Sequence, residues 1–185
     1  MRLIATVELI VCWFAWGYPF LFRAPHHQKR ECTTAPPLMQ AGLLLECVAI
    51  FMAWAFRLPA VDGPGVWRVA GSMVLGPVAG VLSWGAVKHL GRQFRLRAGL
   101  YADHELVRTG PYALVRHPIY ASLLAILLST LLLLTPWEWL AVSLALFAIG
   151  TELRIRTEDG LLAARFGQAF EEYKKQVPAY IPFVR

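Results

Sequence analysis

Long apolar runs constrain the fold of this chain more than any other feature of its sequence. Five of them, at residues 3–22, 38–56, 66–87, 119–134 and 137–150, are interrupted by few charges. A helix of about 20 apolar residues crosses the roughly 30 Å core of a bilayer. The chain is 57% hydrophobic and 16% charged, whereas soluble domains are about 45–50% apolar and about 25% charged. We therefore expect an all-α integral membrane protein with about five transmembrane helices, and we exclude a soluble enzyme, a disordered chain and a secreted disulfide scaffold.

The runs also predict how the helices are connected. The first run lacks the small-residue cleavage site of a signal peptide, so it is predicted to stay in place as a helix. The third contains Gly76 and Gly80, a spacing that lets helices approach closely. Only Thr135 and Pro136 separate the last two short runs, which predicts a helical hairpin over residues 119–150. We expect one membrane domain, residues 1–185, with three spans in residues 1–87 and a functional core in residues 88–185.

The basic residues are distributed very unevenly between the two sides of the predicted membrane. Five spans place the two chain ends on opposite sides. Arg2, Arg57 and Arg68 then lie on one side, and the other 15 of the 18 lysines and arginines lie on the other. Basic loops face the cytoplasm, so the C-terminus is predicted to be cytoplasmic. The net charge of +6 then indicates loops near anionic lipid, and no nucleic-acid partner is expected.

Two polar segments, residues 88–118 and 151–185, flank the predicted hairpin and should meet at its cytoplasmic mouth. The stretch from His104 to Tyr120, at the end of the first segment and the start of the next helix, contains two histidines, two tyrosines and Arg116, more than membrane anchoring needs. In the second, Arg154 and Glu158 share a helix face, either as a surface ion pair or as two groups that point into a pocket. After Gly160, apolar residues at helical spacing predict an amphipathic helix that lies on the membrane face and covers the pocket.

Other polar residues allow fewer conclusions. Glu8 and Glu46 lie inside apolar runs, where a carboxyl group is either functional and paired or protonated and hydrogen-bonded between helices. His26 and His27 have no further ligand at metal-binding spacing, so no metal site is expected. The tryptophans are predicted to anchor the spans at the membrane interface.

The polar segments contain a series of short motifs. In chain order they are Leu90-Gly91-Arg92, His104-Glu105-Leu106-Val107, Gly110-Pro111-Tyr112, Arg116-His117-Pro118-Ile119-Tyr120, Arg154, Glu158-Asp159, Phe166-Gly167, Tyr173 and Val177-Pro178. In these motifs the chain resembles the isoprenylcysteine carboxyl methyltransferases, which belong to a wider set of integral-membrane methyltransferases that includes phospholipid N-methyltransferases. The resemblance covers roughly residues 88–183, and the first two spans carry no motif of it. One departure is that Asp159 follows Glu158 where the family has a further glutamate.

The resemblance implies an S-adenosylmethionine-dependent methyltransferase with its pocket on the cytoplasmic side, covered by the C-terminal segment. The implied acceptor is a prenylated or similar lipidic carboxylate that enters from the bilayer. By position, Arg154 would be the catalytic residue that contacts the acceptor. The cofactor would be held by His104, Glu105, Leu106, Val107, Tyr112, His117, Pro118, Ile119, Tyr120 and Glu158.

The chemistry of these residues fits that expectation without the resemblance. Methyl transfer from a sulfonium needs positioning more than acid–base catalysis. Tyrosine faces can hold the cation, and Arg154 can orient a carboxylate that is already ionised at neutral pH. An amine acceptor would need a base, for which His104 or His117 is available, so a phospholipid N-methyltransferase stays an alternative. A second alternative is a reductase of the sterol-reductase type that uses NADPH, although such enzymes typically carry asparagine at the position of Ile119. A third is a membrane adaptor without enzymatic activity.

Overall fold

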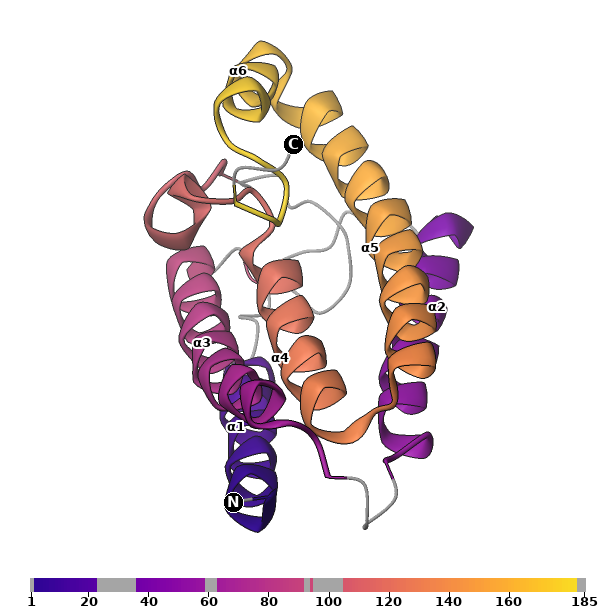
Figure 1. The fold of residues 1–185 in the computed structure, drawn as a ribbon. Coiled ribbons are helices and arrows are strands. Elements are labelled where there is room, and N and C mark those ends of the chain that lie inside the picture. Colours follow the sequence, from indigo (N-terminus) through magenta and orange to yellow (C-terminus); the bar gives the residue numbers. More distant parts are fainter. Residues whose placement is uncertain (1, 23–35, 59–62, 92–93, 95–104, 183–185) are drawn as a thin grey trace.

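The structure, a computed structural model, describes residues 2–22, 36–58, 63–91, 94 and 105–182 of the chain. Within these residues it contains only helices (Figure 1), which confirms the predicted all-α class. The helices are α1 (Arg2–Phe22), α2 (Pro37–Ala55), α3 (Val66–Leu90), the short 3₁₀ helix η2 (Gly110–Ala113), α4 (Pro118–Leu134), α5 (Trp137–Phe166) and α6 (Gln168–Gln176).

The helices have the apolar outer surfaces of a membrane protein. In the described part of the chain, α1, α2 and α3 are each long and apolar enough to cross a bilayer, and α4 is a shorter apolar helix. Large side chains on the outer faces are exposed, for example Phe14 at 76% and Val81 at 74%. Such a continuous apolar exterior is not stable in water. The chain is therefore an integral membrane protein. The first turn of α1 and helix α6 lie at opposite ends of the bundle (Figure 1).

The C-terminal third differs from the sequence-based expectation. The last apolar run ends at Gly150, but α5 continues without a break for 30 residues to Phe166. The predicted amphipathic helix after Gly160 is therefore wrong in its bounds: its first part belongs to α5, and only α6 is a separate helix. The break falls at Gly167, whose φ of +54° is a left-handed conformation that favours glycine. This turn directs α6 back over the end of the bundle.

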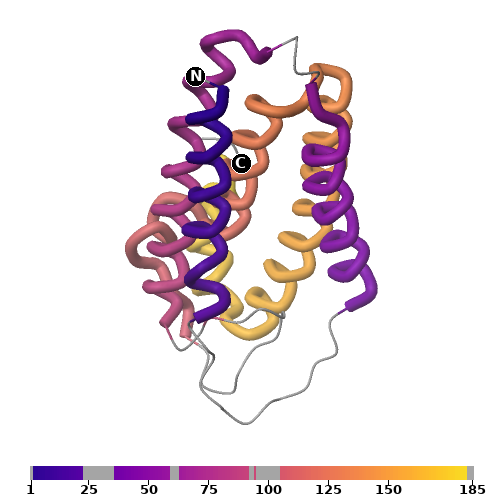
Figure 2. The backbone as a smooth tube through the Cα atoms, turned by 90° about the horizontal axis from the view of Figure 1, so that it is seen from below, coloured from indigo at the N-terminus to yellow at the C-terminus, as the bar shows by residue number. Residues whose placement is uncertain are grey.

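The two helices of the predicted hairpin are consecutive but hardly pack on each other. The turn at Thr135 and Pro136 is present as predicted. However, α4 packs against α3 and α1, whereas α5 packs against α2. Seen from below, α2 and α5 stand apart from α1, α3 and α4 (Figure 2). The two groups meet at the α4–α5 turn and diverge toward the end that carries α6.

Glycines set the closest approaches between helices. A Cβ atom on Gly42 of α2 would lie 2.6 Å from the carbonyl oxygen of Gly150 on α5, and a Cβ on Gly150 would lie equally close to the Gly42 carbonyl. No side chain fits there, so α2 and α5 are in backbone contact. Gly76 of α3 faces Cys12 of α1, where a Cβ would lie 2.9 Å from the sulfur. The predicted close contact at Gly76 is thus between α3 and α1.

Polar side chains join the helices inside the bundle. The indole of Trp13 donates to Thr130 over 3.0 Å, and that of Trp16 donates to Ser122 over 3.0 Å. Both bonds connect α1 to α4, so the prediction that the tryptophans are interface anchors is wrong for these two. In a bilayer core such bonds between helices satisfy groups that have no water available.

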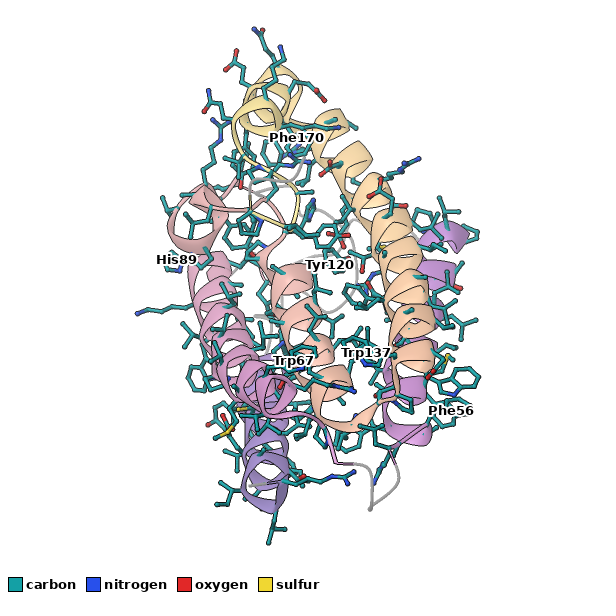
Figure 3. All side chains as sticks on the ribbon, viewed as in Figure 1. Phe56, Trp67, His89, Tyr120, Trp137 and Phe170 are labelled. Carbon is teal, nitrogen blue, oxygen red and sulfur yellow. The ribbon has the colours of Figure 1, made fainter. Side chains whose placement is uncertain are left out.

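One buried arginine caps the end of α4. Arg68 is 5% exposed, and its guanidinium donates to the carbonyl oxygens of Leu132 over 2.8 Å, Leu131 over 2.9 Å, and Thr135. The Leu131 carbonyl also accepts from the backbone amide of Thr135 over 3.1 Å. The last carbonyls of a helix have no donor further along its hydrogen-bond ladder, so the guanidinium supplies one. The cation also complements the negative end of the helix dipole. The Arg68 guanidinium lies 4.9 Å from the centre of the Trp137 ring, which stacks with Trp67 (Figure 3).

We expect Arg68→Gln to lower the stability of the bundle. The shorter, uncharged side chain leaves buried carbonyls at the end of α4 without donors, at a cost of about 1.5–3 kcal/mol. The measurement is the midpoint of thermal unfolding in detergent. Arg57→Gln is the matched control because Arg57 is exposed and its Nε donates to the nearby Trp54 carbonyl. Equal midpoints for the two variants would contradict this role of Arg68.

Candidate functional site

A cavity of about 580 Å³ opens where α4 and α5 diverge. Trp16 and Phe20 of α1 and Leu43 and Glu46 of α2 line it, together with residues of α4, α5 and α6. Helix α3 contributes Leu90, at its end. The two polar segments form its end and the apolar helices form its sides. Tyr120 lies between α4 and α5, and Phe170 lies under α6 (Figure 3).

Most of the sequence-predicted site residues line this one cavity. Pro118 is buried as the first residue of α4, where proline is favoured, but it does not line the cavity. His104 lies outside the described residues. The lining includes Glu105, Leu106, Val107, Tyr112, His117, Ile119, Tyr120, Arg154 and Glu158.

The two polar segments are joined directly by side chains. The hydroxyl of Tyr120, at the start of α4, donates to Glu158 Oε1 of α5 over 2.5 Å. The second oxygen of Glu158 lies 3.4 Å from Nδ1 of His117. Tyr120 and His117 are both buried, whereas Glu158 stays partly exposed to the cavity. The expected meeting of residues before the hairpin with residues after it is therefore present.

Asp159, whose role the sequence left open, is the centre of a second polar cluster. It is 7% exposed and accepts from Nε2 of His117 at 2.9 Å and from Arg116 at 3.2 Å, and the Lys174 ammonium lies 3.7 Å away. We call these four residues the Asp159 cluster. The cluster joins α5, α6 and the segment before α4.

The same segment also holds the chain that follows α6. The backbone amides of Arg116 and His117 donate to the carbonyls of Pro178 and Ala179, each over 2.8 Å. The Arg116 side chain donates to the carbonyls of Lys174 over 3.1 Å and Val177 over 2.5 Å. The C-terminal segment is thus fixed across the polar end of the cavity.

The Asp159 cluster shifts the titration of its members. Burial by itself would lower the pKa of His117, but the hydrogen bonds and negative charges of Asp159 and Glu158 outweigh burial and raise it. Burial would raise the pKa of Asp159, but His117, Arg116 and Lys174 outweigh it and lower that pKa. Both shifts favour the charged pair.

Arg154 has a partner that the sequence did not predict. Its Nη1 is ion-paired with Glu46 of α2, and no hydrogen bond joins it to Glu158 on its own helix. Its guanidinium lies over the ring of Tyr120, 4.8 Å from the ring centre. The other Glu46 oxygen accepts from the Thr151 hydroxyl over 2.8 Å. In the sequence, Glu46 is a carboxyl group inside an apolar run. That position predicted that Glu46 is either paired with another group or protonated, but it did not identify Arg154 as the partner.

A turn before α4 places Tyr112 in the site. Gly110 has a φ of +61°, and a Cβ there would lie 2.2 Å from Nε2 of His89, so only glycine fits. The turn puts Tyr112 into the cavity wall, and Tyr173 of α6 donates to its carbonyl over 2.5 Å. Burial raises the pKa of Tyr112, and it raises that of Tyr173 to about 12, so both are neutral at physiological pH.

The cavity residues can bind a ligand that carries both positively and negatively charged groups. Glu158 can accept from an ammonium, and Tyr112 and Tyr120 can contact a cation with their ring faces. The Nε atoms of Arg116 and Arg154 are buried and have no hydrogen-bond partner among the described residues, an unusual state for guanidinium donors. The α1 and α2 walls are apolar, apart from Glu46. Such a cavity, mostly apolar with a few converging polar groups, is typical of a binding site.

Comparison with known proteins places this cavity in a family. The isoprenylcysteine carboxyl methyltransferase (ICMT) family matches residues 73–164, which include Tyr112, His117, Tyr120, Arg154 and Glu158. A probable protein-S-isoprenylcysteine O-methyltransferase of Oryza sativa subsp. indica is 31% identical over 175 residues, 91% of this chain and 90% of the rice protein.

Other relatives match over shorter stretches and carry different names. A protein-S-isoprenylcysteine O-methyltransferase of Schizosaccharomyces pombe is 41% identical over 44% of this chain and 35% of its own. The nickel-cobalt-cadmium resistance protein NccN of Alcaligenes xylosoxydans xylosoxydans is 35% identical over 64% of this chain and 63% of its own. The chain thus matches only part of these two relatives, whereas its match to the rice protein extends over nearly both chains. On that match and on the family's coverage of the cavity residues, the chain belongs to the isoprenylcysteine carboxyl methyltransferase family.

Proposed function

We propose that this chain is a membrane methyltransferase that moves a methyl group from S-adenosylmethionine to the carboxylate of a lipid-tailed acceptor of the isoprenylcysteine type. The observation that carries the proposal is the contact of Tyr120 with Glu158 inside a cavity that also contains Arg154. The Glu158 carboxylate and the Tyr120 ring can bind a cation, and the Arg154 guanidinium beside them can bind an anion. That pairing of groups is what a cationic methyl donor and an anionic acceptor require.

The cavity residues fit S-adenosylmethionine in size and in chemistry. The volume of about 580 Å³ lies within the roughly 300–1,000 Å³ of typical small-molecule pockets. Glu158 would bind the amino group, and the rings of Tyr112 and Tyr120 would contact the sulfonium. The N-terminus of α4 offers free backbone amides for the carboxylate. Further contacts are assigned to Glu105, Leu106, Val107, His117 and Ile119, which line the same cavity.

The chain contributes position and charge to the transfer. When bound, S-adenosylmethionine supplies an electrophilic methyl group; the acceptor oxygen forms a bond to that carbon as the carbon–sulfur bond breaks, and the electron pair stays on sulfur. Arg154 orients the acceptor carboxylate, which needs no base because it is ionised at neutral pH. The surrounding helices exclude water and hold the reacting groups in line.

An amine acceptor is less well served by these residues. It would have to lose a proton to a base before transfer. His117, one of the two histidines considered for that task, has Nε2 bonded to Asp159 and Nδ1 next to Glu158, so neither nitrogen is available to an acceptor. Because both His117 nitrogens are engaged, a carboxylate acceptor is favoured over phosphatidylethanolamine and similar amines.

The apolar walls fit an acceptor with a lipid tail. Trp16 and Leu21 of α1 and Leu43 and Ile50 of α2 are apolar residues of the cavity lining. A tail that leaves the bilayer between helices can stay in apolar surroundings while its carboxylate reaches Arg154. From the positive-inside asymmetry we infer that the polar end, and the C-terminal segment that covers it, face the cytoplasm.

The direct test is methyl transfer by the purified protein in detergent. Labelled S-adenosylmethionine is offered with a farnesylated cysteine analogue, phosphatidylethanolamine or a small thiol. We expect label on the carboxylate of the farnesylated acceptor. Label on the amine instead would contradict the acceptor class. Stabilisation by reduced nicotinamide but not by S-adenosylmethionine would contradict the methyltransferase.

We expect Glu158→Gln to weaken the binding of S-adenosylmethionine by about 10-fold to 100-fold. The substitution keeps the shape but removes the charge that pairs with an ammonium, and charge-assisted bonds contribute about 1.5–3 kcal/mol. The measurement is equilibrium binding in detergent. Glu152→Gln, on the same helix but outside the cavity, serves as the control. Equal affinities for the two variants would remove Glu158 from the binding site.

Arg154→Lys should impair use of the acceptor more than binding of the cofactor. Lysine keeps the positive charge but lacks the planar fork that contacts a carboxylate through two bonds. The readouts are KM for the farnesylated acceptor and Kd for S-adenosylmethionine. Arg156→Lys is the matched control, because Arg156 is exposed and paired with Glu152 on the outer face. Equal losses in both readouts would mean that Arg154 supports the cofactor pocket instead.

The attachment of the C-terminal segment should depend on pH through His117. Its pKa is raised in the folded protein, so its stabilising contribution is complete below its ordinary pKa near 6.5 and is lost as pH rises through the raised value. The pKa of Asp159 is lowered, so its contribution is lost only as pH falls through that value in acid. We expect the unfolding midpoint to fall with rising pH in the wild type and to change less in His117→Gln. Identical pH profiles would contradict this.

A further inference from the structure

Glu46 is a fully buried carboxylate in the middle of a span that carries no family motif. It is 1% exposed, and it is the only charged residue of α2. The family match begins at residue 73 and so does not include it. A buried carboxylate in a membrane helix is costly, and it is retained where it has a defined partner and a task. Its two oxygens are both engaged, one by Arg154 and one by Thr151.

The packing of α2 on α5 fixes this contact. Gly42 lies one helical turn before Glu46 and is in backbone contact with Gly150, one turn before Arg154. A Cβ on Gly42 would also lie 2.6 Å from Cγ of Arg154, so the arginine side chain runs along the surface of α2. Glu46 is thus held at the point where the guanidinium leaves α5. The helix contact and the ion pair form one unit.

The ion pair determines which way Arg154 faces. Arg154 has two carboxylates within reach: Glu46 across the helix contact, and Glu158 four residues along its own helix, on the same face. Because Glu46 takes Nη1, the guanidinium lies over the Tyr120 ring, and Glu158 is left to accept from the Tyr120 hydroxyl. Without Glu46, the nearest anion for Arg154 would be Glu158.

We propose that Glu46 is a positioning residue that holds Arg154 toward the acceptor and keeps it from pairing with Glu158. The inference rests on the proposed function, in which Arg154 orients the acceptor and Glu158 binds the cofactor. Glu46 is 1% exposed and both of its oxygens are engaged, so it acts through Arg154. Holding Arg154 away from Glu158 leaves one group for an anion and one for a cation, so that two ligands of opposite charge can bind side by side.

The test compares Glu46→Gln with Glu8→Gln in the full-length protein. Both replace an intramembrane glutamate by its neutral isostere, but Glu8 is on α1 and does not line the cavity. We expect Glu46→Gln to lower kcat/KM for the farnesylated acceptor on the order of a hundredfold, as a misplaced positioning group does. Glu46→Asp should restore part of the loss because it keeps the charge. Glu8→Gln should have wild-type acceptor kinetics.

A second pair of measurements separates positioning from a merely structural role. A structural role would lower the unfolding midpoint and the fraction of active protein but would leave acceptor KM unchanged in the folded fraction. Positioning raises acceptor KM in protein that still binds S-adenosylmethionine. The double variant Glu46→Gln with Arg154→Gln leaves no unpaired buried charge, so it should unfold at a higher temperature than Glu46→Gln alone and yet stay inactive.

The outcomes distinguish the two proposals. If the wild type methylates the farnesylated acceptor and Glu46→Gln does so with the same KM and kcat, the positioning role is overturned and the proposed function stands. If the wild type methylates no acceptor, both are overturned. Should Glu46→Gln not fold, Thr151→Val, which removes one of the two bonds to Glu46, and Glu46→Asp are measured in its place. Wild-type kinetics in both would overturn the positioning role.

Discussion

The backbone contact between Gly42 and Gly150 is the constraint on which the site depends. It draws α5 onto α2 and away from α4, its neighbour in the chain. The α4–α5 turn is itself fixed, because Arg68 caps α4 and the Thr135 hydroxyl donates to the Ala53 carbonyl of α2 over 3.1 Å. Two helices that are joined at one end and packed on different partners must separate toward the other end. The cavity is the space that this separation leaves.

The polar groups around that space are paired because an unpaired group in a bilayer is costly. From the membrane interior outward, Glu46 pairs with Arg154, which lies over Tyr120, and Tyr120 donates to Glu158. His117 then connects Glu158 to Asp159. This series of contacts crosses from α2 to α5 to α4 and back to α5. It holds the cavity wall rigid from the apolar core to the polar end, while parts of Glu158 and Arg154 stay accessible to a ligand.

Several features of this structure could be predicted from the sequence because they depend on local pattern. The runs at 3–22, 38–56 and 66–87 predict α1, α2 and α3 closely, since length and hydropathy decide a span. Most of the predicted site residues line the cavity, although the apolar walls that α1 and α2 contribute were not predicted. The errors have physical causes: Gly160 does not interrupt α5 because a single glycine is tolerated in a helix that is supported by packing, and Trp13 and Trp16 find hydroxyl partners inside the bundle rather than at its ends.

Composition and spacing along the chain are enough to predict that it lies in a membrane, where its first three helices lie, and that two polar segments gather at one end. The separation of α4 from α5, the pairing of Arg154 with Glu46 rather than with Glu158, and the attachment of the C-terminal segment through Asp159 follow from tertiary packing alone. Each of these contacts joins residues that are far apart in the chain or chooses between two equally possible partners. The choice is made by how closely helix backbones can approach, and two glycines more than a hundred residues apart set that distance here.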